Sequence, residues 1–312
     1  MKLFSCGASV VTAVPPSSAR SFAASARLVG QMRRRPFGWT GVQVPVIGQG
    51  TWYMERDGRA RAVAALRAGL EAGMTHIDTA EMYGNGRVEE IVGEAIGDRR
   101  REVFLVSKVL PHNASFDGVL RACEGSLRRL RTDHLDVYLL HWPGSHPLQE
   151  TIRAFERLVE EGKIRFWGVS NFDAAELDEA LGIAGPRRLA CNQVLYHLKQ
   201  RAIEHAVIPW CEAHAAAIVG YSPFGSGSFP SPASAGGRVL QEIAAARGAT
   251  PHQVALAFLL RRDAVFIIPK SSTVEHVREN AAAADLELST DEIRRIEEAF
   301  PLGRPPRSLP MI

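Results

Sequence analysis

Short apolar runs alternate with longer amphipathic segments along most of the chain. The amphipathic segments, such as 58–73 and 117–130, repeat apolar residues at spacings of three and four, which is typical of helices. The runs between them are short and have the composition of strands; they are 45–50, 75–78, 103–107, 135–140, 165–170, 190–194, 217–222 and 265–269. Because most of these runs are apolar at consecutive positions, they indicate a parallel sheet with both faces buried under helices.

Eight strands separated by helices suit a (β/α)8 TIM barrel, and we predict this α/β fold. A β-hairpin is expected ahead of the first barrel strand, at 37–44, where a Thr-Gly pair suits the turn. An open doubly wound sheet is the structural alternative. That fold usually binds dinucleotides through a GxGxxG motif after its first strand. No such motif follows the first predicted strand, and the nearest match, 224–232, is a proline-rich loop that opens no helix directly.

The composition limits the classes of protein to which the chain can belong. With 312 residues, 46% of them hydrophobic, it can bury a large core, and single α/β barrels reach this length. The net charge of +3 is small, and no basic run is interleaved with aromatic residues, so we expect no nucleic-acid partner. No apolar run approaches the roughly 20 residues of a membrane helix. We expect a cytoplasmic protein that acts as a monomer away from membranes.

The four cysteines are scattered and form no CxxC pair; they are Cys6, Cys123, Cys191 and Cys211. This spacing favours free thiols in a reducing compartment over disulfides or a zinc site. We therefore expect no bound metal.

The N-terminal segment differs from the rest of the chain. Residues 1–54 contain no Asp or Glu, and 17–35 are rich in Ser, Ala and Arg, which is the composition of an organellar transit peptide. An over-long gene start, with Met32 as the true initiator, is the other explanation. In both cases residues 1–31 form an extension outside the fold, and 32–312 form one barrel domain. A transit peptide would place the protein in an organelle.

Polar side chains follow seven of the eight predicted strands. In a barrel of this kind the carboxyl ends of all strands meet at one rim, where active sites lie. The side chains at these positions are Asp78 with Tyr83, then Lys108, His141, Ser170 with Asn171, Gln193, Tyr221 and Lys270. Individually, Asp78 could cap a helix and His141 could be a core histidine. Seven such positions at one rim are hard to attribute to chance.

Four of these side chains suit proton donation to a carbonyl oxygen. A tyrosine with a pKa near 10 donates its proton reluctantly at neutral pH. A neighbouring Lys108 would lower the pKa of Tyr83, and Asp78 would keep the lysine charged. Only five of the 37 Lys and Arg residues are lysines, and both Lys108 and Lys270 lie at strand ends, which indicates a need for a compact ammonium. His141 could orient the carbonyl, and a nicotinamide hydride is the natural nucleophile.

The chain resembles the aldo-keto reductases over essentially all of residues 36–300. The resemblance rests on GQGTW (48–52), HIDTAEMYG (76–84), VSKV (106–109), LDVYLLHWPG (135–144), EGKIRFWGVSNF (161–172), NQVLYH (192–197), YSPF (221–224) and IPKSSTVEHVREN (268–280). GQGTWYM and DTAEMYG are also similar to the bacterial branch that includes methylglyoxal reductases. The resemblance implies a (β/α)8 barrel that reduces aldehydes or ketones, such as small methylglyoxal-type carbonyls, with NADPH, NADH being possible.

The resemblance also implies a role for each matching residue. Tyr83 would be the general acid, Lys108 and Asp78 would tune it, and His141 would orient the substrate. The walls of the substrate pocket would be Trp52, Met82 and Trp142. The cofactor-binding residues would be Thr51, Trp52, Ser170, Asn171, Gln193, Tyr221, Ser222, Pro223, Phe224, Lys270, Ser271, Ser272, His276, Glu279 and Asn280.

The resemblance also implies which part of the cofactor these residues would contact. The carboxamide would be held by Ser170, Asn171 and Gln193, with Tyr221 stacked on the nicotinamide ring. Lys270 and Ser271 would meet the adenosine phosphate, and the adenine would lie against Glu279 and Asn280.

One cofactor position departs from the family pattern. Many members have an arginine six residues after the IPK lysine, where it holds the 2′-phosphate, and here His276 stands in that place. Because histidine is largely neutral at pH 7, we expect only a modest preference for NADPH over NADH. The chain also ends soon after Phe300, so we expect an open pocket that accepts small or varied carbonyls.

Two other classes of function compete with this one. A regulatory subunit could bind a nicotinamide cofactor tightly and sense redox state, but a complete Asp, Tyr, Lys and His set favours turnover. A metal-dependent barrel hydrolase would need an HxH or carboxylate cluster at the strand ends, and the sequence has none there.

Overall fold

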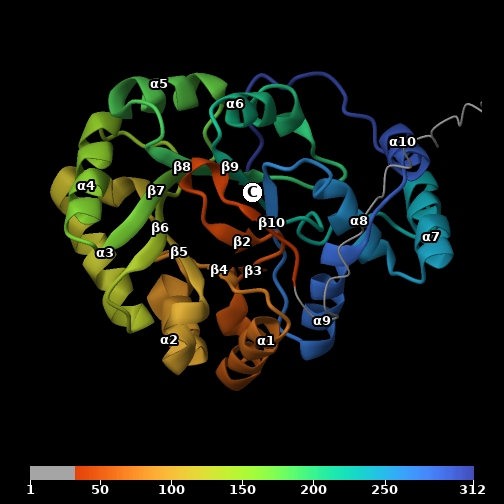
Figure 1. The fold of residues 1–312 in the computed structure, drawn as a ribbon, viewed down its shortest axis with the longest axis horizontal. Coiled ribbons are helices and arrows are strands. Elements are labelled where there is room, and N and C mark those ends of the chain that lie inside the picture. Colours follow the sequence, from red (N-terminus) through yellow and green to blue (C-terminus); the bar gives the residue numbers. More distant parts are fainter. Residues whose placement is uncertain (1–31) are drawn as a thin grey trace, which may run out of the picture.

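Eight parallel strands form a ring at the centre of the computed structural model, which describes residues 32–312 (Figure 1). The strands lie side by side in chain order: β3 (Gln49–Gly50), β4 (His76–Asp78), β5 (Phe104–Val109), β6 (Leu135–Leu140), β7 (Ile164–Ser170), β8 (Leu189–Leu195), β9 (Ala217–Tyr221) and β10 (Val265–Ile268). The predicted eight-stranded α/β barrel is confirmed. The N-terminal extension 1–31, predicted as a targeting segment or an over-long start, lies outside the described residues.

Backbone pairing between the first and last strands closes the ring. Ile47 pairs with Ile267, and Gly50 pairs with Lys270, as isolated parallel bridges. A Cβ atom on Gly50 would lie 2.6 Å from the carbonyl oxygen of Ile268, so this close approach requires a glycine. Closure brings the loop after β3 next to the loop after β10.

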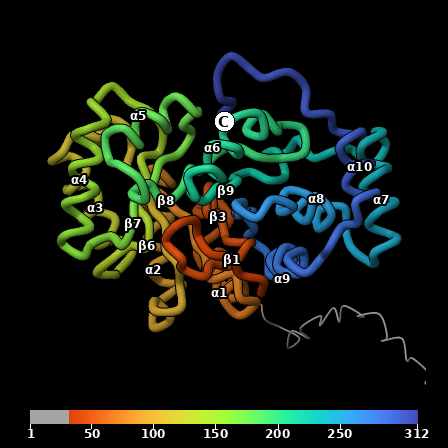
Figure 2. Tube along the Cα trace, turned by 45° about the horizontal axis from the view of Figure 1, so that its top comes forward, coloured from red at the N-terminus to blue at the C-terminus, as the bar shows by residue number. Residues whose placement is uncertain are grey.

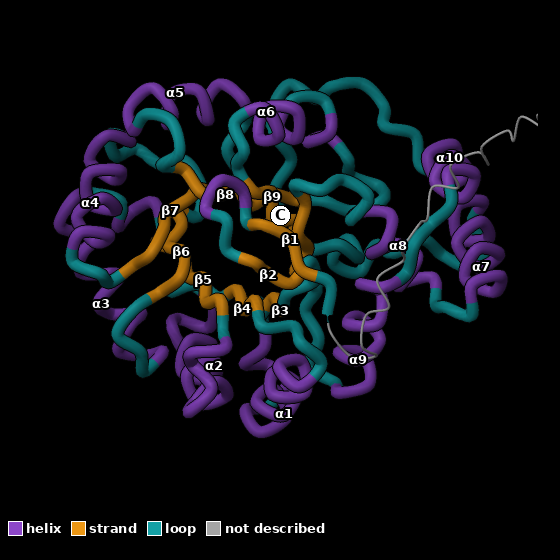
Figure 3. The backbone as a smooth tube through the Cα atoms, in the orientation of Figure 1, coloured by secondary structure: helices purple, strands orange, loops and turns teal. Residues whose placement is uncertain are grey.

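Helices surround the ring on the outside (Figure 3). They are α1 (Arg59–Glu71), α2 (Arg87–Ile96), α3 (Phe116–Leu130), α4 (Leu148–Glu160), α5 (Ala174–Ala184), α6 (Val207–Ala213), α7 (Ala235–Arg247), α8 (Pro251–Leu259), α9 (Val274–Ala282) and α10 (Thr290–Ala299). In α4 the buried residues Ile152, Phe155 and Leu158 recur every three positions. This spacing gives the helix one apolar face to pack on the barrel.

The predicted N-terminal hairpin is confirmed, with Thr40 and Gly41 in its connection, but its strands lie farther apart in the chain than the sequence predicts. β1 (Arg34–Pro36) pairs with β2 (Gln43–Pro45), so most of the predicted segment 37–44 is the connection between the strands. Phe37 is fully buried. The centroid of its ring lies 5.0 Å from that of Phe104 and 5.1 Å from that of Phe266. The Phe37 side chain therefore packs inside the barrel, near the amino ends of β5 and β10.

The described residues also bear on the thiol prediction. Cys123, Cys191 and Cys211 are buried free thiols, as predicted, and Cys6 lies outside the described residues. None of the helices found in 32–312 has the length and apolar character needed to cross a membrane.

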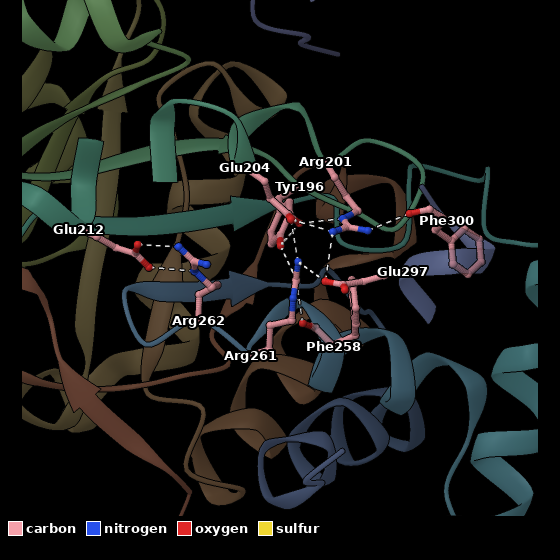
Figure 4. A network of polar contacts seen from close by, with 9 residues as sticks. All are labelled: Tyr196, Arg201, Glu204, Glu212, Phe258, Arg261, Arg262, Glu297 and Phe300. Carbon is pink, nitrogen blue, oxygen red and sulfur yellow. Dashed lines mark hydrogen bonds and ion pairs between the residues drawn. The ribbon is translucent and has the colours of Figure 1, made fainter. Parts of the chain in front are cut away.

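A buried polar network holds the start of the C-terminal tail (Figure 4). Arg201 donates to the carbonyl oxygen of Phe300 at 2.8 Å and to both carboxylate oxygens of Glu204 at 2.7 Å. Arg261 donates to Glu204 as well, at 2.7 Å. Burial works against the charge on Glu204, but the two arginines outweigh it and hold the pKa of this carboxyl at about 2. From Phe300 the tail arches back to the mouth of the barrel (Figure 2).

Replacing Glu204 with Gln should lower the free energy of unfolding at neutral pH by about 3–5 kcal/mol. The buried Arg201 and the largely buried Arg261 would lose their nearest carboxylate, and Glu297 would remain as a partner at 3.7 Å. The folded pKa of Glu204 lies below its ordinary value of 4.5, so its contribution is present above that pH and is lost as pH falls toward about 2. Urea unfolding at neutral pH and at about pH 3 should therefore show a smaller pH effect in the variant than in the wild type.

Glu212→Gln is the matched control for that measurement. Glu212 pairs with Arg262 at 2.6 Å, but the two side chains are 35% and 45% exposed. Water screens such a pair, so its loss should cost about 1 kcal/mol or less. Equal losses of stability in the two variants would contradict a special contribution from the buried network.

Candidate active site

A cavity of about 640 Å³ opens at the carboxyl ends of the barrel strands. That volume suits a small-molecule ligand. Its walls include the predicted residues Asp78, Tyr83, His141, Ser170, Asn171, Gln193, Tyr221 and Lys270. Lys108 is fully buried directly behind Asp78 and Tyr83. The structure therefore brings the seven strand-end positions together at one rim.

The ammonium of Lys108 is the centre of a buried polar cluster. It donates to Asp78 Oδ1 at 2.6 Å, to the carbonyl oxygen of Thr79 at 2.8 Å and to the hydroxyl oxygen of Tyr83 at 3.1 Å. An ammonium has three hydrogens and accepts none, so these three bonds use all of them. Tyr83 therefore accepts a bond from Lys108 and keeps its own hydrogen to donate into the cavity.

The cluster holds one charged pair. Burial lowers the pKa of Lys108, but Asp78 and Tyr83 outweigh burial and the pKa is raised, so the side chain stays an ammonium. The second carboxylate oxygen of Asp78 accepts from Gln193 Nε2 at 2.7 Å. Both oxygens of this buried carboxylate thus have partners, as a buried charge requires.

The pKa of Tyr83 differs from the value that the sequence predicts. Lys108 does favour the phenolate, but burial of the phenol disfavours it more strongly, and the pKa of Tyr83 is raised. The prediction of a lowered pKa is wrong because it leaves out the removal of the ring from water. Tyr83 consequently holds its proton at neutral pH, which is the form that a proton donor needs.

His141 lies next to Tyr83 in the wall of the cavity. The two ring centroids are 5.8 Å apart and the rings are nearly perpendicular, at 71°. Burial, together with the charge of Lys108, lowers the pKa of His141 to about 2. The imidazole is therefore neutral, with one nitrogen that donates a hydrogen bond and one that accepts.

A second polar cluster lies beside the first, at the ends of β7 and β9. Tyr221 donates to Asn171 Oδ1 at 2.9 Å, and Asn171 Nδ2 donates to Ser170 Oγ at 3.1 Å. Asn171 has a φ of 63°, in the left-handed region that asparagine tolerates better than most residues. Burial raises the pKa of Tyr221 to about 12, so this group is also neutral. Such hydroxyl and amide groups can pair with an uncharged amide ligand.

The residues predicted for the cofactor phosphate and adenine lie at the edge of the cavity and beyond it. Lys270 lines the cavity, whereas Ser271, Ser272, His276, Glu279 and Asn280 do not. His276 is exposed on α9. The carboxylate of Glu279 accepts a 2.5 Å hydrogen bond from Thr250 Oγ1, so it is already held in place.

The family follows from comparison with known proteins. Residues 46–300 match the Aldo/keto reductase family model. The chain belongs to the aldo/keto reductase family. This reductase is 46% identical over 273 residues to methylglyoxal reductase YeaE from Escherichia coli (strain K12), which covers 87% of this chain and 96% of that relative. It is 35% identical over 260 residues to glyoxal reductase from Bacillus subtilis (strain 168), which covers 82% and 89%.

Solved structures agree with this assignment. The crystal structure of an aldo/keto reductase from Klebsiella pneumoniae in complex with NADP and acetate matches the reductase with a TM-score of 0.84 and 46% identity. The match covers 90% of this chain and 100% of that chain. The resemblance that the sequence motifs carry is confirmed, and the chain is an oxidoreductase of this family.

The cavity of the reductase has walls that the sequence does not predict. Trp52, Met82 and Trp142 line it, and so do Thr51, Ser222, Pro223 and Phe224. The additional residues are Gly50, Tyr53, Ser226, Gly227, Ile268, Met311 and Ile312. Tyr53 stacks on Trp52 at 4.4 Å and could have been found from its position next to Trp52. Nothing in the sequence around Met311 and Ile312 indicates that they reach the cavity. Because the C-terminal tail reaches the cavity, the pocket is less open than the short segment after Phe300 led us to expect.

Replacing Lys108 with Arg should remove most carbonyl reduction, by roughly 100-fold or more. A planar guanidinium cannot take the place of the compact ammonium in a fully buried slot between Asp78 and Tyr83. Steady-state reduction of methylglyoxal with NADPH measures the effect. Lys163→Arg is the control, because the ammonium of Lys163 pairs with Glu124 and Glu161 nearer the surface. Activity within a few-fold of the wild type in the Lys108 variant would argue against this cluster as the active centre.

Proposed function

We propose that this reductase uses NADPH to reduce small aldehydes and ketones to alcohols, with Tyr83 as the proton donor. The observation that carries the proposal is the hydrogen bond from Lys108 to Tyr83, which leaves the phenol hydrogen free to enter the cavity. Family membership and the NADP in a similar crystal structure support the cofactor. The names of the methylglyoxal and glyoxal reductases among its relatives support short carbonyl substrates.

The proton transfer follows from the geometry of the buried cluster. A bound nicotinamide would supply a hydride to the carbonyl carbon. As the new C–H bond forms, the π electrons of the carbonyl move to its oxygen, and Tyr83 transfers its proton there. The resulting phenolate would be stabilised by the charge of Lys108, whose ammonium lies 3.1 Å from the Tyr83 hydroxyl oxygen. Asp78 keeps Lys108 charged throughout this step.

His141 has a different part in the same reaction. Because its imidazole is neutral, it can donate one hydrogen bond to the carbonyl oxygen without competing as an acid. Its ring lies nearly perpendicular to that of Tyr83. Two donors that approach one oxygen from different directions fix the angle of the carbonyl, which positions it for attack.

The polar wall formed by β7, β8 and β9 suits the nicotinamide end of the cofactor. Ser170, Asn171 and Gln193 present hydroxyl and amide groups that can pair with a carboxamide, and the Tyr221 ring lies beside them. The cofactor would continue past Thr51, Trp52, Ser222, Pro223 and Phe224. Its phosphates and adenine would meet Lys270, Ser271, Ser272, His276, Glu279 and Asn280.

The substrate would occupy the apolar part of the cavity. Trp52, Met82 and Trp142 form this part, and Met311 and Ile312 of the C-terminal tail narrow it. Such walls offer few polar partners, so a short substrate would be held chiefly through its carbonyl oxygen by the donors of the catalytic cluster.

Tyr83→Phe tests the assignment of the proton donor, because it removes the hydroxyl and keeps the ring. Turnover of methylglyoxal with NADPH should fall by about 10²–10⁴-fold, whereas the dissociation constant of NADPH should change by no more than about twofold. Tyr53→Phe is the control, since Tyr53 lies on the same cavity wall without contacting Lys108. Wild-type turnover in the Tyr83 variant would refute the assignment.

His276→Arg tests the predicted 2′-phosphate site. An arginine is always charged and can hold a phosphate through two parallel hydrogen bonds, which an imidazole cannot do. NADPH should bind about tenfold more tightly, corresponding to about 1–2 kcal/mol, while the affinity for NADH stays nearly constant. Fluorescence titration of each cofactor gives both constants. An equal effect on the two cofactors, or none, would place the phosphate elsewhere.

A further inference from the structure

A second ion pair lies at the edge of the cavity and belongs to neither polar cluster. Asp57 ends a short 3-10 helix (Met54–Asp57) in the loop after β3, and its carboxylate accepts hydrogen bonds from the ammonium of Lys270 and the hydroxyl of Ser272. The bond from Ser272 is 2.5 Å long. Lys270 is the residue proposed above for the cofactor phosphate, and Ser272 is one of the proposed cofactor-binding residues beside it.

Closure of the barrel makes this contact possible. Gly50 at the end of β3 pairs with Lys270 just after β10, so the two loops start side by side. Arg61, at the start of α1, donates to the backbone carbonyl of Ser272 at 3.0 Å and ties the loops together a second time. The position of Asp57 beside Lys270 is therefore built into the fold.

The carboxylate of Asp57 occupies the place that an anionic ligand would take. A single oxygen of Asp57, Oδ2, accepts from both Lys270 and Ser272. An ammonium and a hydroxyl that converge on one oxygen are donors that a phosphate oxygen would use equally well. The bonds from Lys270 and Ser272 lower the pKa of Asp57, so the group is a carboxylate at neutral pH.

We infer that Asp57 is a specificity residue that competes with the cofactor 2′-phosphate for Lys270 and Ser272 and so narrows the preference for NADPH over NADH. The inference rests on the proposed cofactor site. NADPH must displace this carboxylate or accept a like charge beside its phosphate. NADH has a ribose hydroxyl in place of that phosphate. The hydroxyl can donate a hydrogen bond to a carboxylate, as it does to acidic residues in other dinucleotide sites.

Asp57 and His276 would both reduce the positive charge available to the 2′-phosphate. His276 replaces the second positive group that many relatives have, and Asp57 neutralises the first one. The modest preference for NADPH that the sequence predicts would then depend on two residues, of which only His276 departs from a family motif.

Asp57→Asn tests the inference by binding alone. Titration of protein fluorescence with NADP⁺ and with NAD⁺ gives two dissociation constants, and their ratio should shift about tenfold toward NADP⁺, mainly because NADP⁺ binds more tightly. Asp57→Ser should shift it in the same direction, which separates the loss of charge from any contact made by the new amide. An unchanged ratio, or weaker binding of both cofactors, would overturn the inference.

Asp98→Asn is the matched control for the loss of one negative charge. Asp98 is exposed in the 3-10 helix Gly97–Glu102, which leads into the amino end of β5, away from the cavity. Its replacement should leave the ratio of the two dissociation constants unchanged. A shift as large as that of the Asp57 variant would show that net charge, and not the position of Asp57, sets the preference.

Lys270→Gln separates the inference from the proposed function on which it rests. If Lys270 binds the 2′-phosphate, its loss should weaken NADP⁺ by about tenfold or more and leave NAD⁺ nearly unchanged. If it does so while the Asp57 variants show no shift, the role of Asp57 is wrong and the cofactor site stands. If the loss of Lys270 affects both cofactors equally, the proposed phosphate site itself is wrong.

Discussion

The buried ammonium of Lys108 is the interaction on which the rest of the site depends. A charge removed from water destabilises the fold unless polar partners surround it. Lys108 meets this requirement with Asp78, the carbonyl of Thr79 and Tyr83, all contributed by β4 and the loop that follows it. β4 pairs with β5 in a register that places Asp78 opposite Val106, and a slip by one residue would turn Lys108 to the other face of the sheet.

The same dry environment sets the protonation states of the other groups. Burial raises the pKa of Tyr83 and lowers the pKa of His141, so both are neutral beside one charged pair. The cavity therefore offers a protonated phenol and an uncharged imidazole next to a fixed positive charge. This combination suits carbonyl reduction by hydride, because negative charge develops on the carbonyl oxygen only as the hydride arrives.

Closure of the barrel has consequences at both ends of the chain. It places the loop after β3 against the loop after β10, which allows Asp57 to reach Lys270 and Ser272. The C-terminal tail then adds Met311 and Ile312 to the cavity from a separate anchor, the carbonyl of Phe300 held by Arg201. Cofactor preference and substrate size would thus be set by segments far apart in the sequence, while the proposed proton donor and its partners lie on β4, on β5 and in the segment that follows β4.

The sequence by itself determines the barrel and the set of polar side chains at its rim, because both follow from short-range patterns. Apolar runs such as 135–140 match their strands, and polar residues that follow buried strands must share a rim once the strands are parallel. The tertiary structure alone decides the pKa of Tyr83, the Asp57–Lys270 contact and the path of the tail to Ile312. Each of these depends on burial or on contact between distant segments, which a pattern of neighbouring residues does not record.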